Sequence, residues 1–321
     1  MKRPVAVLLA ALSLAVSLPL LAQSYPAKPV RVLIPWPPGG SNDVVGRIVS
    51  QKLSESLGQQ FVIENRGGAA GTIGADLVAK SAPDGYTVMI HSATHVANAH
   101  LYKKLPYDTL KDFAAVAPLA VQVGMLVVHP SMPVRTVKDL VALAKARPGQ
   151  VVYASSGNGS YVHLTMALLN SMTGTKMIHV PYKGGGPAGI AIVSGETQAM
   201  IATIGALYPH LVAKQVRPIA VTSAGRVKQF PEVPTIAESG VPGYEFTAWV
   251  GAFAPAGTPK PIVDRLNAEF QKALRDARVS DLLTKQTLDP MFMSPEQFAA
   301  RLKSDYDKYA KVVKESGATI D

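Results

Sequence analysis

Four glycine-rich loops constrain the fold of this chain more than any other feature. They lie at residues 35–43, 65–72, 155–160 and 181–187, and each follows a short apolar run and precedes a helical pattern. Short apolar runs bounded by Gly and Pro are typical of buried strands, and strands that alternate with helices predict an α/β fold. Such loops lie at the carboxyl ends of strands, where open α/β sheets bind ligands. The four loops therefore predict one cleft between two sheets.

The first loop has the sequence PWPPGGSND and ends at Asp43, where a helix N-cap or a first-turn carboxylate belongs. A strand, a glycine-rich loop and a helix N-terminus together can hold an anion, because free N–H groups and the helix dipole point at one place. For any single loop an ordinary strand-to-helix turn is the alternative, since turn chemistry alone selects Gly. Four such loops favour an anion-binding cleft.

The expected elements alternate along the chain. In the first half we expect strands at 30–35, 61–64 and 86–91, helices at 44–57 and 73–81, an irregular stretch at 95–113, and a long apolar connection that leaves the first sheet at 114–128. In the second half we expect a helix at 136–146, strands at 151–154, 177–180, 198–204 and 217–222 with helices between them, a returning strand at 246–254, and helices at 259–277, 281–285 and 295–316. The pattern predicts mostly parallel sheets.

Two crossings, near 116–126 and 244–254, predict two lobes joined by a hinge. Lobe 1 is expected to comprise residues 23–120 plus 250–321, and lobe 2 residues 121–249. A cleft between two such lobes suits closure on a small ligand. A single lobe is the alternative.

The N-terminus has the pattern of an export signal. Residues 1–22 begin with Lys2 and Arg3, continue as an apolar stretch and end at Ala22, which predicts a secretory signal peptide, with a retained anchor as the alternative. No later segment has the roughly 20 consecutive apolar residues that a membrane span requires. The chain contains no Cys, so apolar burial without disulfides must hold the fold.

The charge distribution argues against nucleic acid as a partner. The formal net charge is +10, but the cations are scattered and form no run of five or more. Aromatic residues make up only 7% of the chain, so a stacking surface for bases is not expected. Attraction of small anions and an ordinary solvated basic surface both fit this charge.

No enzymatic machinery is evident in the sequence. Motifs for a nucleophile elbow, a zinc protease, a phosphate-binding P-loop and a cysteine pair are all missing from it. His91, His95 and His100 have no acidic or further ligand spaced with them, so neither a metal nor a cofactor is expected. His163 and His179 read as hydrogen-bonded structural residues. The sequence therefore predicts a binding protein and not an enzyme.

A series of distinctive motifs runs in order through nearly all of the chain after residue 22. They are YPAKPVR (25–31), the 35–43 loop with Arg47, GGAAG (67–71), PDGYT (83–87), YD (107–108) with KDF (111–113), HVPYKG (179–184), AVTS (220–223), PEVPT (231–235), and Trp249 followed by PAGTP (255–259). In these motifs the chain resembles the Bug-type extracytoplasmic solute receptors, the substrate-binding components of tripartite tricarboxylate transporters.

The resemblance implies a periplasmic binding protein fold of type II-like architecture, a periplasmic location and a monomer. It also implies a small organic carboxylate as ligand and the membrane permease subunits of a tripartite transporter as partners. A periplasmic sensor that acts on a two-component histidine kinase is an alternative. An exported enzyme on the same frame is another, with Asp43 and His163 as its only acid–base candidates.

The resemblance further implies two jaws that hold carboxylates through backbone N–H groups and hydroxyls. The first jaw comprises Pro38, Gly39, Gly40, Ser41, Asn42 and Asp43, with Ala69 and Ala70 behind it and Trp36 beside it. The second jaw comprises Ser155, Ser156, Gly157, Gly159 and Ser160, with His163 adjacent. The expected ligand-binding residues also include Ser92, Tyr182, Thr203 and Trp249.

The chain departs from the pattern of these receptors in three places. Asn42 stands where Thr is common, so an amide replaces a hydroxyl. Thr203, after Ala202, stands in a region where Asp is common, which argues against a ligand with an ammonium group. Trp36 stands where Phe or Tyr is usual and favours an aromatic ligand, although core packing is the alternative for both Trp36 and Trp249.

Overall fold

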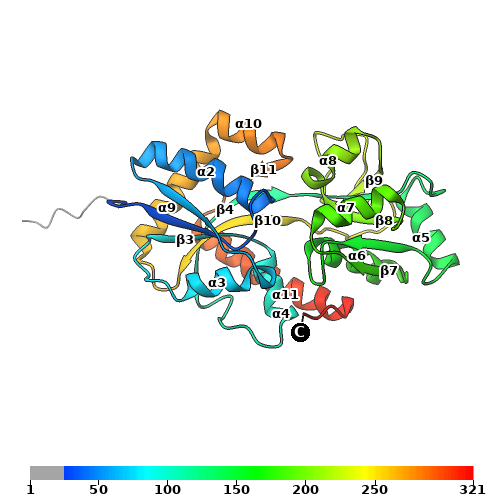
Figure 1. Cartoon of the computed structure of the whole chain (residues 1–321), viewed down its shortest axis with the longest axis horizontal. Coiled ribbons are helices and arrows are strands. Elements are labelled where there is room, and N and C mark those ends of the chain that lie inside the picture. The colour runs from blue at the N-terminus through cyan, green and yellow to red at the C-terminus, as the bar shows by residue number, and fades with distance from the viewer. Residues whose placement is uncertain (1–24, 321) are drawn as a thin grey trace, which may run out of the picture.

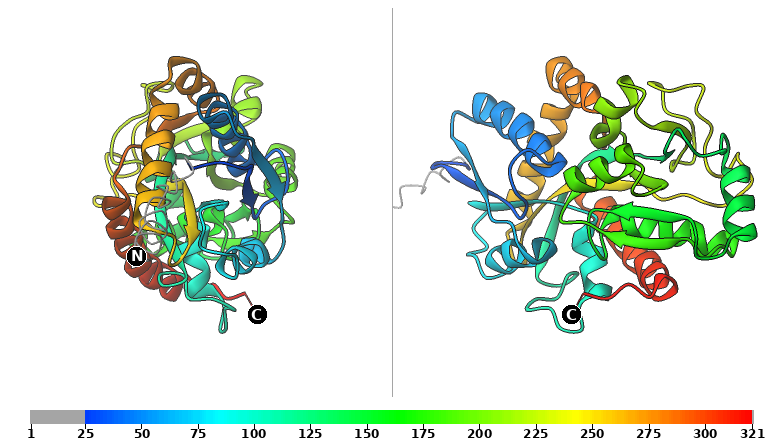
Figure 2. Two further views of the ribbon diagram at one scale, coloured as in Figure 1. Left: turned by 90° about the vertical axis from the view of Figure 1, so that its left-hand side faces the viewer. Right: turned by 45° about the vertical axis from the view of Figure 1, so that its right-hand side comes forward.

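The computed structural model describes residues 25–320, so the predicted signal peptide at 1–22 lies outside the described residues. Within that range the strands form one six-stranded sheet and one five-stranded sheet, which lie side by side with helices around each (Figures 1 and 2). None of the helices in residues 25–320 is long and apolar enough to cross a membrane.

The first sheet has the strand order β11-β4-β10-β3-β1-β2. Its strands are β1 (Val30–Ile34), β2 (Phe61–Asn65), β3 (Thr87–Ser92), β4 (Phe113–Gln122), β10 (Ala248–Pro255) and β11 (Leu288–Pro290). The helices of this lobe are α2 (Ser41–Leu57), the short 3-10 helix η1 (Ala69–Gly71), α3 (Thr72–Ala79), α4 (Thr94–Leu101), α9 (Lys260–Arg275), α10 (Ala277–Lys285) and α11 (Pro295–Ser316).

The second sheet has the strand order β7-β6-β8-β5-β9. Its strands are β5 (Gly124–Val128), β6 (Val152–Ser155), β7 (Ile178–Pro181), β8 (Ala199–Thr203) and β9 (Arg217–Val221). Its helices are α5 (Val137–Ala146), α6 (Tyr161–Thr173), α7 (Gly185–Ser194) and α8 (Ile204–Val212).

The apolar runs that precede the loops are strands buried on both faces. In β1, Leu33 packs into one hydrophobic core while Val32 and Ile34 pack into the core on the opposite face of the sheet. All three side chains are fully buried. Burial on both faces explains why these strands read as continuous apolar runs and do not alternate with polar residues.

The two-lobed α/β fold is confirmed, but both sheets are mixed and not mostly parallel. Strands β1, β2 and β3 pair in parallel, and so do β6, β7 and β8 where they adjoin. In contrast, β10 runs antiparallel to β3 and β4, and β5 runs antiparallel to β8 and β9. The chain reaches β5 and β10 directly from the other sheet. Parallel neighbours are usually joined by a helix that crosses over within the same sheet, and these two strands have no such connection to the strands beside them.

The apolar run at 114–128 is a crossing between the sheets, but it is made of two strands. β4 ends at Gln122 in the first sheet, and β5 begins at Gly124 in the second. The chain returns through β10, which follows the loop-rich passage after β9 (Figure 1). The predicted division of the lobes at residues 120/121 and 249/250 stays a prediction.

The expectation of an irregular stretch at 95–113 is partly wrong, because α4 occupies its beginning. Residues 94–101 read THVANAHL, whose polar and histidine content hides the helical pattern. His95 and Asn98 are nevertheless fully buried, as are the apolar residues beside them. Tertiary packing therefore makes this segment a helix where its local sequence does not predict one.

Helix α11 contacts both lobes. Ser294 and Gln297 form a capping box at its start, and Gly317 ends it in the left-handed conformation. Along its length it packs on α4 and β4 of the first lobe and on α6 of the second. In the right-hand view of Figure 2 this red helix runs from the first lobe to below the second.

Candidate ligand-binding site

Asp43 holds the loop between β1 and α2 in shape. It lies in the first turn of α2 with 3% of its surface exposed. Its Oδ2 accepts hydrogen bonds from the Gly39 N–H and from Arg47 Nε, each at 2.9 Å, and its Oδ1 accepts one from Asn65 Nδ2 at 2.9 Å. Asn65 Nδ2 also donates to the Trp36 carbonyl at 3.0 Å. The carboxylate therefore fixes the loop from within.

The charge of Asp43 is stabilised in this position. Burial alone would raise the pKa of its carboxyl, but hydrogen bonds from Arg47, Gly39 and Asn65 outweigh burial, and the pKa lies below its ordinary value. Asp43 is thus an anion with its acceptor sites occupied, which does not suit it to act as a general base.

The first turn of α2 points outward from this fixed loop. The N-cap is Gly40, and in the described part of the chain no side chain caps the helix. Pro38, Gly39 and Gly40 are exposed, and Ser41 is partly exposed. The first N–H groups of a helix have no acceptor within it, and the helix dipole adds a partial positive charge of about 0.5 at this end. This end of α2 is therefore suited to an anion.

A strained turn lies behind the first loop. Ala69 and Ala70 of η1 have φ values of 47° and 52°, in the left-handed region that residues with a Cβ rarely adopt. Asn98 Nδ2 in α4 donates to the Ala70 carbonyl at 3.0 Å. At Gly71, a Cβ would lie only 2.6 Å from His91 Nε2, so only Gly fits there. The packing of this turn against α4 and β3 holds it in place.

Trp36 and Ser92, two further residues that were predicted to bind the ligand, lie next to His91. Trp36 is half-buried and its Nε1 donates to His91 Nδ1 at 3.3 Å. Ser92, at the end of β3, is 8% exposed, and its Oγ lies 3.3 Å from Thr94 Oγ1. The Asn42 side chain is also buried, and its Oδ1 has no hydrogen-bond partner within residues 25–320.

The loop between β6 and α6 is organised by its own side chains. Ser155 is buried, and its Oγ lies 2.6 Å from His179 Nε2 and accepts from the Gly157 N–H at 3.1 Å. Ser160 caps α6 by accepting from the His163 N–H at 3.2 Å. In the other direction the Gly159 N–H donates to His163 Nδ1 at 3.1 Å. These contacts occupy much of the backbone that the sequence offered for a ligand.

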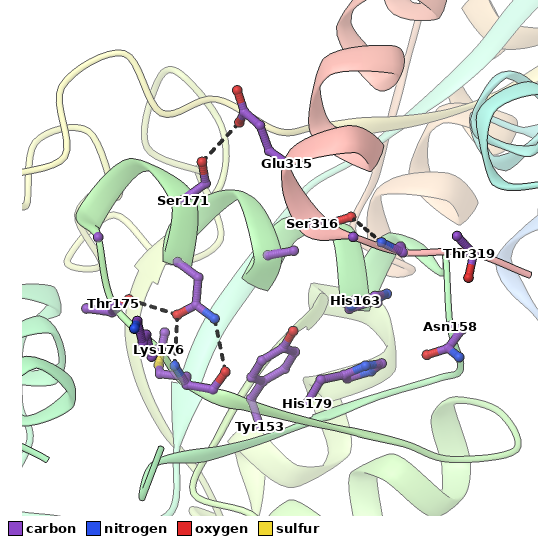
Figure 3. Close-up of a pocket in the computed structure, with 16 residues that line it drawn as sticks. Tyr153, Asn158, His163, Ser171, Thr175, Lys176, His179, Glu315, Ser316 and Thr319 are labelled. Carbon is purple, nitrogen blue, oxygen red and sulfur yellow. Dashed lines mark hydrogen bonds between the residues drawn. The ribbon is translucent and has the colours of Figure 1, made fainter. Parts of the chain in front are cut away.

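Two stacked histidines support this second loop. The rings of His163 and His179 lie face to face, with centroids 3.8 Å apart and an interplanar angle of 5°, and Tyr153 extends the stack (Figure 3). Burial lowers the pKa of His163 to about 4. Burial and the neighbouring His163 lower the pKa of His179 to about 4 as well. Both rings are therefore neutral near pH 7, so His163 Nδ1 can accept the Gly159 N–H and His179 Nε2 can pair with Ser155 Oγ.

The two lobes approach each other closely at two glycines, where a side chain would not fit. A Cβ on Gly159 would lie 2.5 Å from Leu101 Cδ1 at the end of α4, and one on Gly205 in α8 would lie 2.8 Å from the Gln286 carbonyl. Gly159 belongs to the second loop, whereas α4 also carries Asn98, which supports the turn behind the first loop. Helix α4 therefore links the surroundings of both loops.

The remaining predicted residues lie in varied environments. Thr203 is partly exposed at the end of β8. The Tyr182 hydroxyl donates to Glu196 Oε1 at 2.7 Å. Trp249 is 1% exposed, packs edge-on against Phe298, and its Nε1 donates to Asp305 Oδ2 at 2.7 Å. It is therefore a core residue, which was the alternative to ligand binding. We therefore correct its assignment as a ligand-binding residue.

Sequence reasoning missed Asn65 and Asn98, which brace the first loop and the turn behind it. Asn65 reads only as the start of the second loop, and Asn98 falls in the stretch that was expected to be irregular. Within residues 25–320, no group of three or more His, Cys, Asp or Glu side chains could hold a metal ion. His91 and His95 lie 5.3 Å apart, measured between ring centroids, while His100 packs against Tyr306.

Two lobes with mixed sheets, joined by crossing strands and carrying glycine-rich loops from both sheets, define a periplasmic binding protein. Solved structures of this class align over most of the chain. The chain belongs to the tripartite tricarboxylate transporter family receptors, whose family model matches residues 45–318. The resemblance inferred from the motifs is confirmed.

Two related sequences illustrate the relationship. The chain is 40% identical over 293 residues to a UPF0065 protein encoded in the tcbD–tcbE intergenic region of a Pseudomonas species, which covers 91% of this chain and 87% of that protein. It is 36% identical over 307 residues to Protein BugT of Bordetella pertussis, which covers 95% of this chain and 94% of that protein.

Two solved structures share the fold closely. An R. palustris protein with adipate aligns with a TM-score of 0.84 and 36% identity, over 92% of this chain and 99% of that one. MatC from Rhodopseudomonas palustris with bound malate aligns with a TM-score of 0.80 and 32% identity, over 90% of this chain and 100% of that one.

Proposed function

We propose that this receptor captures a small organic carboxylate between the first loop and the second loop and delivers it to the membrane permease of a tripartite transporter. The first loop comprises Trp36 to Asp43 with Ala69 and Ala70 behind it, and the second comprises Ser155 to Ser160 with His163. Ser92, Tyr182 and Thr203 are proposed to line the same cleft.

The observation that carries this proposal is the bare N-terminus of α2. Asp43 fixes the loop from inside, so the first-turn N–H groups remain available on the outside. A carboxylate placed there accepts charge-assisted hydrogen bonds and meets the positive end of the helix dipole. Arg47, the cation beside the loop, is already bound to Asp43, so recognition relies on N–H groups and hydroxyls.

The relatives support a carboxylate and favour two carboxyl groups. Adipate and malate, the molecules found with the two related proteins from R. palustris, are both dicarboxylates. A dicarboxylate would place one group at the first loop and the other at the second loop. The sensor hypothesis gains no comparable support from these relatives.

The same proposal covers location, partners and chemistry. Residues 1–22 direct export, the mature protein works in the periplasm as a monomer, and it performs no catalysis. The absence of catalysis is supported by the bonding of the two acid–base candidates: Asp43 has its acceptors filled, and His163 accepts from Gly159.

Thermal unfolding of refolded, ligand-free mature protein tests the function. The panel contains aliphatic and aromatic mono- and dicarboxylates and amino acids. We expect a dicarboxylate to raise the melting temperature, because a ligand at a hundred times its Kd adds about 2.7 kcal/mol of stability. Folded protein that responds to no carboxylate would contradict the proposal, and a response to an amino acid alone would contradict the ligand class.

A further inference from the structure

A polar groove lies beside the second loop and shares Asn158 and His163 with it (Figure 3). It has a volume of about 590 Å³, and its walls are α6, the strands β6 and β7, and residues 315–319 at and after the end of α11. Of the residues described, none from the first loop lines it. The groove therefore brings the second lobe together with the last part of the chain.

Tyr153 is the first of two unused hydrogen-bond donors in this groove. Its side chain is only 3% exposed, and its hydroxyl points up from β6 toward the segment after α11 (Figure 3). Within residues 25–320 that hydroxyl has no hydrogen-bond partner. Burial raises the pKa of Tyr153, so the hydroxyl keeps its proton. A donor that faces a groove without a protein acceptor is open to a ligand or to water.

His163 is the second unused donor. Its Nδ1 accepts the hydrogen bond from the Gly159 N–H, so that nitrogen carries no proton. The proton of the neutral ring must therefore lie on Nε2. His163 is 5% exposed and lines the groove, and among the described residues Nε2 meets no acceptor. The bond to the loop thus fixes the tautomer that presents a donor to the groove.

Most other polar groups in the walls are already paired. Asn170 bonds the Met177 carbonyl and Thr175 Oγ1, and Ser171 Oγ donates to Glu315 Oε2 at 3.0 Å. Glu315 also lies near Lys311, with 4.0 Å between Nζ and Oε1. The exposed Lys176 adds a positive charge to the lining. Among the described residues the lining therefore leaves the Tyr153 hydroxyl and His163 Nε2 without an acceptor, and the negative charge of Glu315 is countered by Lys311 and Lys176.

We propose that this groove is a second binding site, for a small monocarboxylate. Its oxygens accept hydrogen bonds from the Tyr153 hydroxyl and from His163 Nε2–H, and Lys176 adds a weaker attraction. Bonds from neutral donors to a charged acceptor are stronger than those to a neutral one, which favours a carboxylate over an amide or an alcohol. Because the walls come from α6 and from the segment after α11, the ligand would contact both.

Propionate is the probe. Mature protein labelled with ¹⁵N is titrated at pH 7.5 and constant ionic strength. The imidazole signals of His163 together with the Thr319 amide report the groove, and the Gly39 amide reports the cleft. We expect a saturable shift of His163 Nε2. Tyr153→Phe keeps the ring stack and removes the hydroxyl, and should weaken this binding about tenfold while leaving the response of Gly39 unchanged. Tyr208→Phe, on α8 and outside the groove, should change neither.

A second variant keeps the test valid if Tyr153→Phe does not fold. Lys176 is exposed, so Lys176→Gln should leave folding unaffected. It should weaken groove binding about twofold, and the loss should be larger at low salt than at high salt. Equal affinity in the wild type and in every groove variant that folds would overturn the proposal. So would a His163 shift that chloride produces as well as propionate.

Discussion

The two loops proposed to hold the ligand are built in opposite ways. The first is fixed by one buried carboxylate, Asp43, and leaves its helix N-terminus bare. The second is fixed by neutral side chains, Ser155, Ser160 and His163, which bond its own backbone. The first loop therefore keeps more N–H groups for a ligand, whereas the second has a firmer internal frame and fewer free donors.

This difference suggests different roles in binding. A loop with a bare helix end can bind an anion without rearranging, because its donors and dipole are already in place. A loop whose donors are occupied would contribute mainly the shape of the cleft. We infer that the first loop supplies most of the affinity for the carboxylate and that the second limits which ligand fits.

The largest expected effect comes from charge in the second loop. Ser156→Glu places an anion at a partly exposed position, so folding should be unaffected, while a carboxylate ligand should bind more than ~100-fold more weakly, since facing like charges cost several kcal/mol. Titration calorimetry measures the loss. Ser156→Gln has nearly the same size without the charge and should retain most of the affinity. Strong binding by the Glu variant would show that the second loop is not part of the ligand-binding site.

Next in size is the removal of the charge that holds the first loop. Asp43→Asn loses the charge-assisted bonds from Arg47 and Gly39, so the free energy of unfolding in urea should fall by about 2 kcal/mol. Asp264→Asn, at the exposed ion pair with Lys260, is the matched control and should cost under ~0.5 kcal/mol. Equal losses in the two variants would show that Asp43 stabilises the fold no more than an exposed ion pair does.

Acidification should affect the two loops at different pH values. The pKa of His163 falls from an ordinary 6.5 to about 4 on folding, so between these values the unfolded chain binds more protons and stability declines as the pH falls. The pKa of Asp43 is lowered from 3.8, so its contribution persists through that window and is lost only at lower pH. Protonation of His163 Nδ1 also removes the acceptor of the Gly159 N–H.

Amide hydrogen exchange, corrected for its intrinsic pH dependence, checks this prediction. Between pH 7 and pH 4 the Gly159 amide should lose protection, while the Gly39 amide, bound to Asp43, should keep its protection. His163→Gln retains a possible acceptor without titrating, and should make the protection of Gly159 less dependent on pH. Parallel loss at both amides in the wild type would contradict the difference between the loops.

The smallest effects concern backbone conformation and should have opposite signs. Ala70→Gly relieves a left-handed Ala behind the first loop and should add about 0.5 kcal/mol of stability. Gly157 has φ of 127°, and a Cβ there would meet only the Tyr182 carbonyl at an ordinary 3.5 Å. Gly157→Ala should therefore cost about 1 kcal/mol through conformation alone. Urea unfolding measures both, and the same sign for both would refute the assigned strain.

The sequence predicted the loops well because their signals are local. Pro and Gly mark the turns, and Gly39 and Gly157 do adopt left-handed conformations. The directions of the crossing strands could not be predicted, because pairing with β3 or β8 depends on residues far away in the chain. The split of the 114–128 run rests on Val123 and Gly124, which give little local sign of a change of sheet.

The site was predicted less completely than the fold. The loops of the candidate site follow from local sequence, but the side chains that brace them do not. Asn65 and Asn98 reach the first loop and η1 from other elements, and His179 reaches Ser155 from β7. Such contacts follow from tertiary packing, and no spacing in the sequence encodes them. Trp249, by contrast, reads as a ligand contact or a core residue equally well, and only its burial decides between the two.

The last described residue is tied to the place where the lobes meet. The Ile320 N–H donates to the Leu101 carbonyl at 3.0 Å, and a Cβ on Gly159 would lie 3.0 Å from Ile320 Cδ1. A fluorophore attached at this end of the chain would sit within reach of both halves of the receptor. Any motion between them would change the polarity around the dye, which makes this end an attachment point for an optical biosensor of carboxylates.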